Sequence, residues 1–297
     1  MAHPPSAEVL AAFGLSGIVV PVPGGRGLCY RVDDTILKPC DDIAESQWLS
    51  QLSAAILRTS PTSYRLAIPM ASLSDPNSYA VNGWAASSFV SGVPSLNHFP
   101  DVFRAANALH ADLAKAVKSK PAVLANRAFN RFDEADNVAW GEKSVGQVER
   151  VNQAMLGRLQ PILDQLSAAM RPLPGGDPCL KNQLVHMDLL GNVLIEKDKP
   201  PGIIDLTFYW RPAAYALAVV VADGLTRLGS RGPELVELYL QGGEIKRDVG
   251  VQLLVRALYW RYLTFAIDPD LEWVKVNLPQ ADYAGAAGTV CGLINQP

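Results

Sequence analysis

The sequence predicts an α+β protein of two lobes, a small β-rich lobe followed by a larger helical one. Short strand-like runs separated by turns dominate residues 1–92, and long amphipathic helical patterns dominate residues 93–297. The change falls at Gly92-Val93-Pro94, where glycine and proline interrupt both patterns. Of the 297 residues, 49% are hydrophobic, which is enough for a large folded core. We therefore expect one domain at 1–92 and a second at 93–297.

The N-terminal lobe is expected to contain a strand meander between helices. A short helix is predicted over 7–14, and three apolar runs over 17–39 are separated by the turns PGGRG and Asp-Asp. Residues 41–57 predict a helix, because acidic residues cap its start and apolar side chains recur at helical spacing. Strand-like runs follow at 64–69 and 79–90.

The C-terminal lobe is expected to be mainly helical. The clearest amphipathic patterns run over 103–117 and 145–170, and a further helical region runs over 213–266. Between these helices, two short apolar runs at 184–195 and 201–210 each carry polar residues. Polar residues inside such runs mark them as candidates for chemistry.

Composition argues against several classes of partner. The net charge is −3, and no run of five or more Lys or Arg residues marks a nucleic-acid or anionic membrane surface. The four cysteines have no CxxC spacing, which predicts reduced thiols rather than a zinc site. The N-terminus lacks the pattern of a secretory signal, and the most apolar stretch, 213–222, is about half a membrane span. We expect a cytoplasmic protein that contacts neither nucleic acid nor membrane.

The segment from His186 to Asn192, together with Asp205, carries the side chains that phosphoryl transfer requires. One carboxylate deprotonates the attacking hydroxyl, while a second carboxylate and an amide oxygen hold Mg²⁺ against the phosphates. Taken singly, Asp188, Asn192 and Asp205 are more often solvated loop or strand-end residues. Their order is more specific, because His-x-Asp, then Asn, then an apolar pair and Asp is the order of kinase catalytic and metal loops.

This stretch resembles the signature HGDLHPGNVL … GVIDW of the aminoglycoside phosphotransferases and their choline-kinase-like relatives. The resemblance implies a protein-kinase-like fold and a divergent member of that group. It implies that Asp188 is the catalytic base, that Asn192 and Asp205 are Mg²⁺ ligands, and that His186 braces the loop. The implied reaction moves the γ-phosphate of ATP or GTP to a hydroxyl of a small-molecule acceptor.

Residues for the phosphates of the nucleotide precede this signature in the order of the same family. Gly24, Gly25 and Gly27 lie in a turn between two strand-like runs, where glycine would let the backbone approach phosphates. By resemblance, Lys38 at the end of TILKP contacts the α- and β-phosphates, and Glu45 in the next helix pairs with Lys38. A plain β-turn and an edge lysine are the alternatives.

The run Ala86–Gly92 resembles the hinge of the family, LMEFLEG. By that resemblance, the carbonyl of Ser88 and the N–H of Val90 read the edge of the adenine ring. A junction between strand and linker is the equal alternative for this loose motif. Further on, AANALHADLA resembles the family helix LAALHA and implies a packing role for His110.

The sequence departs from the family at the catalytic loop. Asp188 and Asn192 are four residues apart, where the family usually has five. We expect 184–185 and 193–195 to be strands of a hairpin-like unit that fixes the two ends of this loop. Gly191 can then absorb the missing residue, because glycine accepts positive φ. On this basis Asp188 and Asn192 are predicted to converge with Asp205.

Other departures bear on the acceptor. Arg211 and Ala216 stand near the positions of the two acids of the family helix start GDPAYDLA. Two groups of side chains are candidates for an acceptor pocket, although a solvated loop and an ordinary core are the respective alternatives. They are the acids Asp133, Glu134, Asp136 and Glu142, and the aromatic residues Trp140, Tyr209, Trp210 and Trp260.

The sequence motifs leave three candidate functions for this protein. A small-molecule kinase accounts for all the motifs together. A protein kinase is disfavoured, because H-R-D, D-F-G and A-P-E are missing from the sequence. A catalytically silent nucleotide-binding protein that acts through partners draws its support from the shortened loop.

Overall fold

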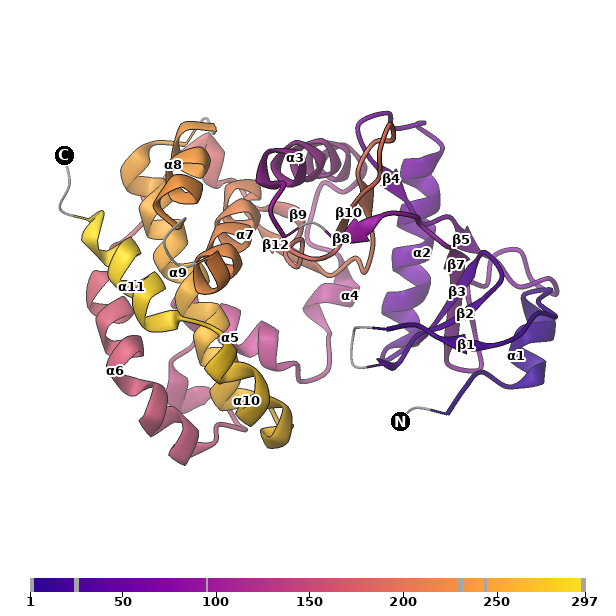
Figure 1. Ribbon diagram of the computed structural model, residues 1–297, viewed down its shortest axis with the longest axis horizontal. Coiled ribbons are helices and arrows are strands. Elements are labelled where there is room, and N and C mark those ends of the chain that lie inside the picture. The colour runs from indigo at the N-terminus through magenta and orange to yellow at the C-terminus, as the bar shows by residue number, and fades with distance from the viewer. Residues whose placement is uncertain (1–2, 24–26, 95, 229–231, 243–244, 295–297) are drawn as a thin grey trace. The chain divides into compact units, whose positions relative to one another are not determined.

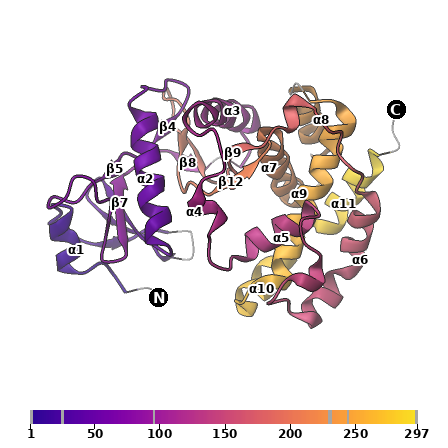
Figure 2. The ribbon, with the colours of Figure 1, turned by 180° about the vertical axis from the view of Figure 1, so that it is seen from behind.

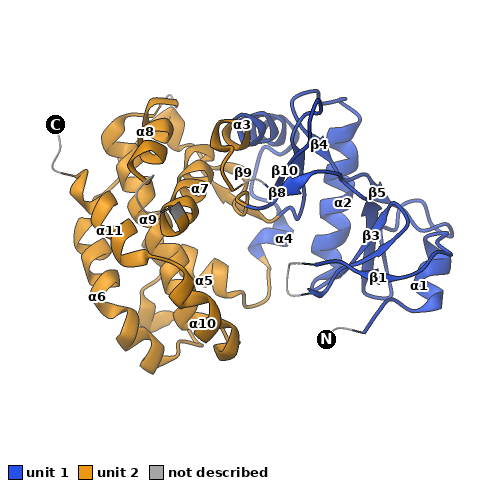
Figure 3. Cartoon of the chain, in the orientation of Figure 1, with its two compact units in different colours: residues 1–95, 104–125, 191–206 blue, residues 96–103, 126–190, 207–297 orange. Residues whose placement is uncertain are grey.

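The computed structural model describes residues 3–23, 27–94, 96–228, 232–242 and 245–294. It confirms the α+β class, with most strands before residue 95 and mainly helices after it (Figure 1). Contacts divide the chain into two compact units (Figure 3). The first comprises 1–95, 104–125 and 191–206, and the second comprises 96–103, 126–190 and 207–297.

The segment 191–206 is notable in this division, because the expected boundary after residue 92 assigns it to the C-terminal domain. In the structure it packs with the N-terminal residues of the first unit. The functional division into 1–92 and 93–297 stays a prediction.

The first unit contains two sheets and the long helix α2. Its elements are α1 (Ala7–Ala12), β1 (Val20–Pro21), β2 (Tyr30–Val32), β3 (Thr35–Pro39), α2 (Ile43–Leu57), β4 (Arg65–Leu66), β5 (Pro69–Met70), β6 (Ala80–Val81), β7 (Trp84–Ser88), β8 (Val93–Pro94), α4 (Ala122–Ala125), β10 (Val193–Ile195) and β11 (Gly202–Ile203). Helix α3 (Phe99–Ala116) begins in the second unit and continues in the first.

The expected meander is the larger sheet, with strand order β1-β2-β3-β7-β5 and β6 also paired with β7. All these pairs are antiparallel, and Lys38 of β3 lies opposite Ala85 of β7. Alternation along β3 places Leu37 in the core with Val32 and Phe13. Lys38 therefore faces away from that core, which leaves its ammonium available for a polar partner.

The smaller sheet of the first unit has the order β4-β11-β10-β8. Strand β10 pairs with β11 and β8, and β9 (Gln183–His186) pairs instead with β12 (Phe208–Arg211) in the second unit. The expectation that 184–185 and 193–195 form one hairpin-like unit is therefore wrong. Strand β10 pairs with β11 across the turn 196–201, whereas β9 pairs with β12 only after the whole of 187–207.

The β10–β11 hairpin packs closely against the segment that follows β7. A Cβ built on Gly202 would lie 2.4 Å from Val90 Cγ1, and a Cβ on Gly92 would lie 3.0 Å from the Ile195 carbonyl oxygen. Arg65 joins the same two segments, because its guanidinium donates to the carbonyls of Pro200 (2.8 Å) and Ser91 (2.9 Å). Ser91 Oγ also donates to Glu196. The segment 90–94 and the hairpin therefore hold each other in place.

The second unit is built around a buried helix. Its elements are α5 (Arg131–Ala139), η2 (Val145–Gln147), α6 (Gln153–Ala169), η3 (Pro178–Leu180), β9, β12, α7 (Ala213–Leu228), α8 (Gly232–Gly242), α9 (Arg247–Ile267), α10 (Leu271–Asn277), η5 (Leu278–Gln280) and α11 (Tyr283–Gly292). Helix α9 is buried from Val249 to Trp260, and α5, α6, α7 and α11 pack against it (Figure 2). A helix whose apolar side chains point to every side requires such a cover.

The helix expected over 145–170 is broken in two. Residues 145–147 form a 3₁₀ turn, and the chain is extended at Val148 before α6 begins at Gln153. Asn152 starts the second helix, since its side chain accepts the N–H of Met155 at 2.9 Å. Asparagine competes with helical hydrogen bonds inside a helix but favours this capping position.

No helix among the described residues is both long enough and apolar enough to cross a membrane.

Replacing Gly202 by alanine is expected to destabilise the first unit. The new Cβ has to displace Val90, and overpacking of this kind costs about 1–3 kcal/mol. Urea unfolding checks this, and Val90→Ala in the same chain should recover part of the loss by making room. Gly157→Ala is the matched control, because its Cβ meets open space in helix α6. Equal stability of Gly202→Ala and the control would contradict the prediction.

Candidate active site

Lys38 and Asp205 form an ion pair within the first unit. Lys38 Nζ donates to Asp205 Oδ1, and both side chains are about half exposed. Desolvation disfavours the lysine charge, but the Asp205 carboxylate outweighs it and raises the pKa of Lys38 above its ordinary value. This ion pair joins β3 to the segment just after β11, although 167 positions separate Lys38 from Asp205.

Asp205 has a left-handed backbone, with φ of 51°. A residue with a Cβ reaches this region at a cost, and such outliers persist where the surrounding structure holds them, often at functional sites. Asn192 lies at the same end of the β10–β11 hairpin, since Val193 pairs with Ile203 and the Ile204 N–H donates to the Asn192 carbonyl at 3.0 Å. The two residues supply a carboxylate and an amide, oxygen donors of the kind that Mg²⁺ takes in small number while it keeps its waters, and the binding of Mg²⁺ here stays a prediction.

The predicted hinge lies at the end of β7. Ser88 N–H donates to the Ile68 carbonyl at 2.9 Å, but the Ile68 N–H donates to Ser88 Oγ at 2.8 Å rather than to the Ser88 carbonyl. Two residues on, the Val90 N–H finds no acceptor among the described residues. The carbonyl of Ser88 and the N–H of Val90 are thus the pair that the hinge prediction names, and their contact with adenine stays a prediction.

The other predicted nucleotide contacts are less defined. Gly24 and Gly25 lie outside the described residues, while Gly27 has φ of 67°, a conformation that favours glycine. Glu45 lies in the first turn of α2, where its N–H donates to the capping carboxylate of Asp42 at 2.9 Å. Lys38 forms an ion pair with Asp205. The pairing of Lys38 with Glu45 stays a prediction.

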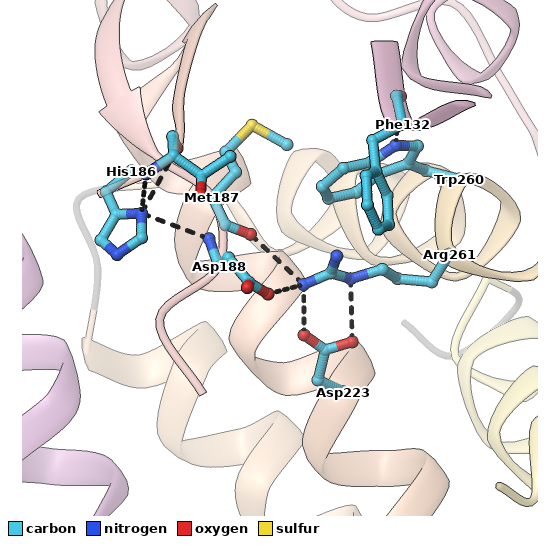
Figure 4. Close-up of polar contacts among 8 residues, drawn as sticks. Phe132, His186, Met187, Asp188, Asp223, Trp260 and Arg261 are labelled. Carbon is cyan, nitrogen blue, oxygen red and sulfur yellow. Dashed lines mark hydrogen bonds and ion pairs between the residues drawn. The ribbon is translucent and has the colours of Figure 1, made fainter. Parts of the chain in front are cut away.

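The loop that carries Asp188 belongs to the second unit and begins where β9 ends. His186 is fully buried there, and its Nδ1 accepts the N–H of Thr207 at 3.2 Å and of Asp188 at 3.5 Å (Figure 4). Nδ1 also lies 3.3 Å from the Thr207 carbonyl oxygen, so the ring connects the loop to the segment that precedes β12. His186 therefore braces the loop, and Gly191, with φ of 89°, turns the chain out of it. Asp205 belongs to the first unit, and its convergence with Asp188 stays a prediction.

Arg261 of helix α9 holds the Asp188 carboxylate. Its Nη2 donates to Asp188 Oδ1 at 2.9 Å, and Nε and Nη2 donate to the two oxygens of Asp223 on α7 at 2.9 and 2.7 Å (Figure 4). Burial raises the pKa of Asp223 although Arg261 opposes the change. Burial disfavours the charge on Arg261, but Asp223 and then Asp188 raise the pKa of Arg261.

Sequence reasoning missed Arg261 and Asp223. Both are charged residues inside strongly apolar helical runs, ALYWRYLTF and VVVADGL. Charged side chains are almost never buried unless they are paired. This rule could have predicted from the sequence that Arg261 and Asp223 each belong to a buried ion pair, although it does not identify the partner.

Each acid of the group at 133–142 is paired with a basic residue of the protein. Asp133 pairs with Arg127 at 3.2 Å, and Glu134 pairs with Lys143 at 2.8 Å. Arg211 donates to Asp136 at 2.7 Å and to Glu142 at 2.5 Å. Arg211, which stands near the position of an acid in the family helix start GDPAYDLA, is therefore the counter-ion of Asp136 and Glu142. The four acids form ion pairs that belong to the fold.

The aromatic candidates also contribute to packing. Trp260 is buried and donates its indole N–H to the Phe132 carbonyl at 2.7 Å. Tyr209 contacts Trp260 edge-on, with ring centroids 5.6 Å apart, and Trp140 contacts Tyr215 in the same way at 4.9 Å. Such edge contacts stabilise protein cores. Ordinary core packing, the alternative to an acceptor pocket, therefore describes Trp140, Tyr209 and Trp260 well.

Comparison with known proteins identifies the fold. No protein-family model matches the sequence, and a search of curated proteins finds no match. Among solved structures, a microcompartment-associated aminopropanol kinase is similar over 95% of this chain and 94% of its own, with 15% identity and a TM-score of 0.64. Spectinomycin phosphotransferase APH(9)-Ia, in complex with ADP and spectinomycin, is similar over 96% of both chains, with 15% identity and a TM-score of 0.58.

A third neighbour is choline kinase LicA from Streptococcus pneumoniae, with 13% identity, 96% of both chains covered and a TM-score of 0.53. The fold is therefore that of small-molecule kinases and phosphotransferases. More narrowly, it is the fold that aminoglycoside phosphotransferases and choline kinases share, as the resemblance of the signature implied. At these identities the likeness concerns the fold, and the chemistry has to be argued from the residues.

Replacing Arg211 by methionine is expected to destabilise the protein by about 3–5 kcal/mol, because it leaves Asp136 buried without a counter-ion. Burial raises the pKa of Asp136 to about 6, well above its unfolded value near 3.9. A folded-state pKa raised in this way favours the folded state at low pH and penalises it as pH rises. Urea unfolding should therefore show a larger loss at pH 8 than at pH 5.

Two further variants sharpen this test. Adding Asp136→Leu to Arg211→Met should recover most of the stability, since it removes the stranded charge. Arg247→Met is the matched control, because it breaks an exposed pair with Glu237 and should change little. A pH-independent loss for Arg211→Met would contradict the assignment of Asp136 as the cause.

Proposed function

We propose that this protein is a Mg²⁺-dependent phosphotransferase that moves the γ-phosphate of ATP or GTP to a hydroxyl of a small molecule. The observation that carries the proposal is the contact between Lys38 and Asp205, with Asn192 at the same hairpin end. A lysine of a central strand, a carboxylate in a strained backbone and a neighbouring amide are the groups that hold nucleotide phosphates and metal in kinases. The shared fold supports the same reading.

In this proposal each residue has a defined task. Lys38 binds the α- and β-phosphates, and the Ser88 carbonyl and Val90 N–H bind the adenine edge. Asp205 and Asn192 hold Mg²⁺, which neutralises the charge of the phosphates when it is bound. Asp188 accepts the proton of the acceptor hydroxyl as the oxygen attacks the γ-phosphorus, and the bond to the nucleoside diphosphate breaks.

The acceptor is proposed to be a small alcohol that is not polycationic. The neighbours act on or bind different compounds, among them an aminopropanol and spectinomycin, so they do not select one. Each of the four acids at 133–142 pairs with Arg127, Lys143 or Arg211, so four negative and three positive charges leave this group only one net negative charge to attract a polycationic aminoglycoside. The best test is a thermal-shift screen of metabolites with Mg²⁺ and ADP.

The silent nucleotide-binding protein is the second candidate, and the short loop between Asp188 and Asn192 favours it. The ordered placement of the Asp188 carboxylate by Arg261 favours the enzyme instead. Turnover of nucleotide separates the two.

Asp188→Asn is expected to abolish most Mg²⁺-dependent turnover of ATP or GTP, because loss of a general base costs about 10²–10⁴-fold. The affinity for Mg·ADP, measured by calorimetry, should stay within about twofold, since the base does not hold the nucleotide. Asp198→Asn is the matched control, because Asp198 lies in the exposed turn between β10 and β11 and should retain turnover. Unchanged turnover in Asp188→Asn would remove the base from the proposal.

Asp205→Asn is expected to remove the dependence of ADP affinity on Mg²⁺. The amide keeps one oxygen ligand and accommodates positive φ, but it loses the charge that binds the cation. Titrating ADP with and without Mg²⁺ checks this, and the metal-free affinity should change less than the Mg²⁺ effect does. A Mg²⁺ effect of normal size in this variant would place the metal elsewhere.

A further inference from the structure

Arg261 makes two different kinds of contact with the loop that carries Asp188. Its Nη2 donates to the carboxylate of Asp188 at 2.9 Å and approaches the Met187 carbonyl at 3.3 Å. One guanidinium nitrogen thus touches both the side chain of Asp188 and the peptide that precedes it. Helix α9, the buried centre of the second unit, is the support for this contact.

Asp223 fixes the orientation of the guanidinium. It accepts from Nε and Nη2 in a two-point contact, which holds the plane of Arg261 in one direction. The guanidinium also packs over the Trp260 ring, with the central carbon 4.4 Å from the ring centroid. Helices α7 and α9 therefore hold Arg261 before any substrate is present.

The side chains of Arg261, Asp223 and Asp188 differ in their exposure to solvent. The side chains of Arg261 and Asp223 are 12% and 17% exposed, whereas that of Asp188 is 45% exposed. Asp188 is accessible to a small acceptor, while the pair that holds it is covered by protein. A purely structural ion pair between α7 and α9 needs only Arg261 and Asp223, and it does not explain the contacts with Asp188 and Met187.

We propose that Arg261, oriented by Asp223, is the positioning residue of the proposed phosphotransferase, and that it sets the direction of the Asp188 carboxylate. The inference rests on the proposed function, because it requires Asp188 to be the base. On this inference, Arg261 anchors the shortened loop to helix α9, so the loop does not depend on its own backbone alone.

Arg261→Lys tests the role of the guanidinium fork. Lysine keeps the charge but cannot donate to Asp223 and Asp188 with fixed geometry. A misplacement of about 1 Å costs on the order of a hundredfold in rate. We expect the kcat of Mg·ATP hydrolysis, with water as the acceptor, to fall by about 10–100-fold. The KM for Mg·ATP and the calorimetric Kd of Mg·ADP should stay within about twofold.

The same substitution is then made in Asp188→Asn. If Arg261 acts through Asp188, Arg261→Lys lowers kcat in the native chain and causes no further loss in Asp188→Asn. Arg256→Lys is the matched control, since Arg256 is buried on the same helix but donates to Gln252 and to the Arg171 carbonyl. It should change stability rather than kcat.

The outcomes separate the inference from the proposed function. If Asp188→Asn loses turnover while Arg261→Lys keeps it, the inference fails and the proposed function stands. The same holds if Arg261→Lys causes equal losses in both backgrounds, which indicates a structural role. If Asp188→Asn turns over normally, both fail. Should Arg261→Lys not fold, Asp223→Asn replaces it, because the loosened guanidinium should lower kcat only while Asp188 is intact.

Discussion

The second unit depends on one constraint, the burial of helix α9 with its charged residues. A helix this buried has to be covered on every side, yet Arg256 lies in its buried stretch and Arg261 directly follows that stretch. A buried guanidinium costs several kcal/mol unless hydrogen bonds and opposite charge compensate it. Carbonyl groups around Arg256 and carboxylates around Arg261 provide that compensation. Helix α7 supplies Asp223 to Arg261, Arg256 donates to Gln252 and to the Arg171 carbonyl, and the loop after β9 supplies Asp188.

Pairing of the β10–β11 hairpin plays the corresponding part in the first unit. The hairpin comes late in the sequence but completes a sheet with β4 and β8 of the N-terminal part. Loop closure over such a distance is costly, and it is offset by the ladder, by Arg65 and by the close contact at Gly202. Asn192 and Asp205 are placed by this pairing, so the proposed metal ligands belong to the same unit as Lys38.

Local patterns predicted the fold well, because period and turn residues are local properties. The meander, helix α2 with its Asp42 cap, and helix α3 lie close to their expected ranges. Strand partners were harder, since the flanks of the Asp188 loop look like one hairpin but pair in different sheets. The contact of Lys38 with Asp205, and the anchoring of Asp188 by Arg261, depend on tertiary contacts that spacing along the chain does not encode.

Ser88 has a consequence that reaches beyond its own side chain. By offering Oγ to the Ile68 N–H, it ends the β5–β7 ladder one bond early. The Ser88 hydroxyl takes the place of the Ser88 carbonyl as the acceptor of the Ile68 N–H, so a side chain ends the hydrogen bonding between β5 and β7 at this point. On the β5 side, hydrogen bonding thus stops at the Ser88 side chain, while on the β3 side the Phe89 N–H still donates to the Asp34 carbonyl at 2.7 Å.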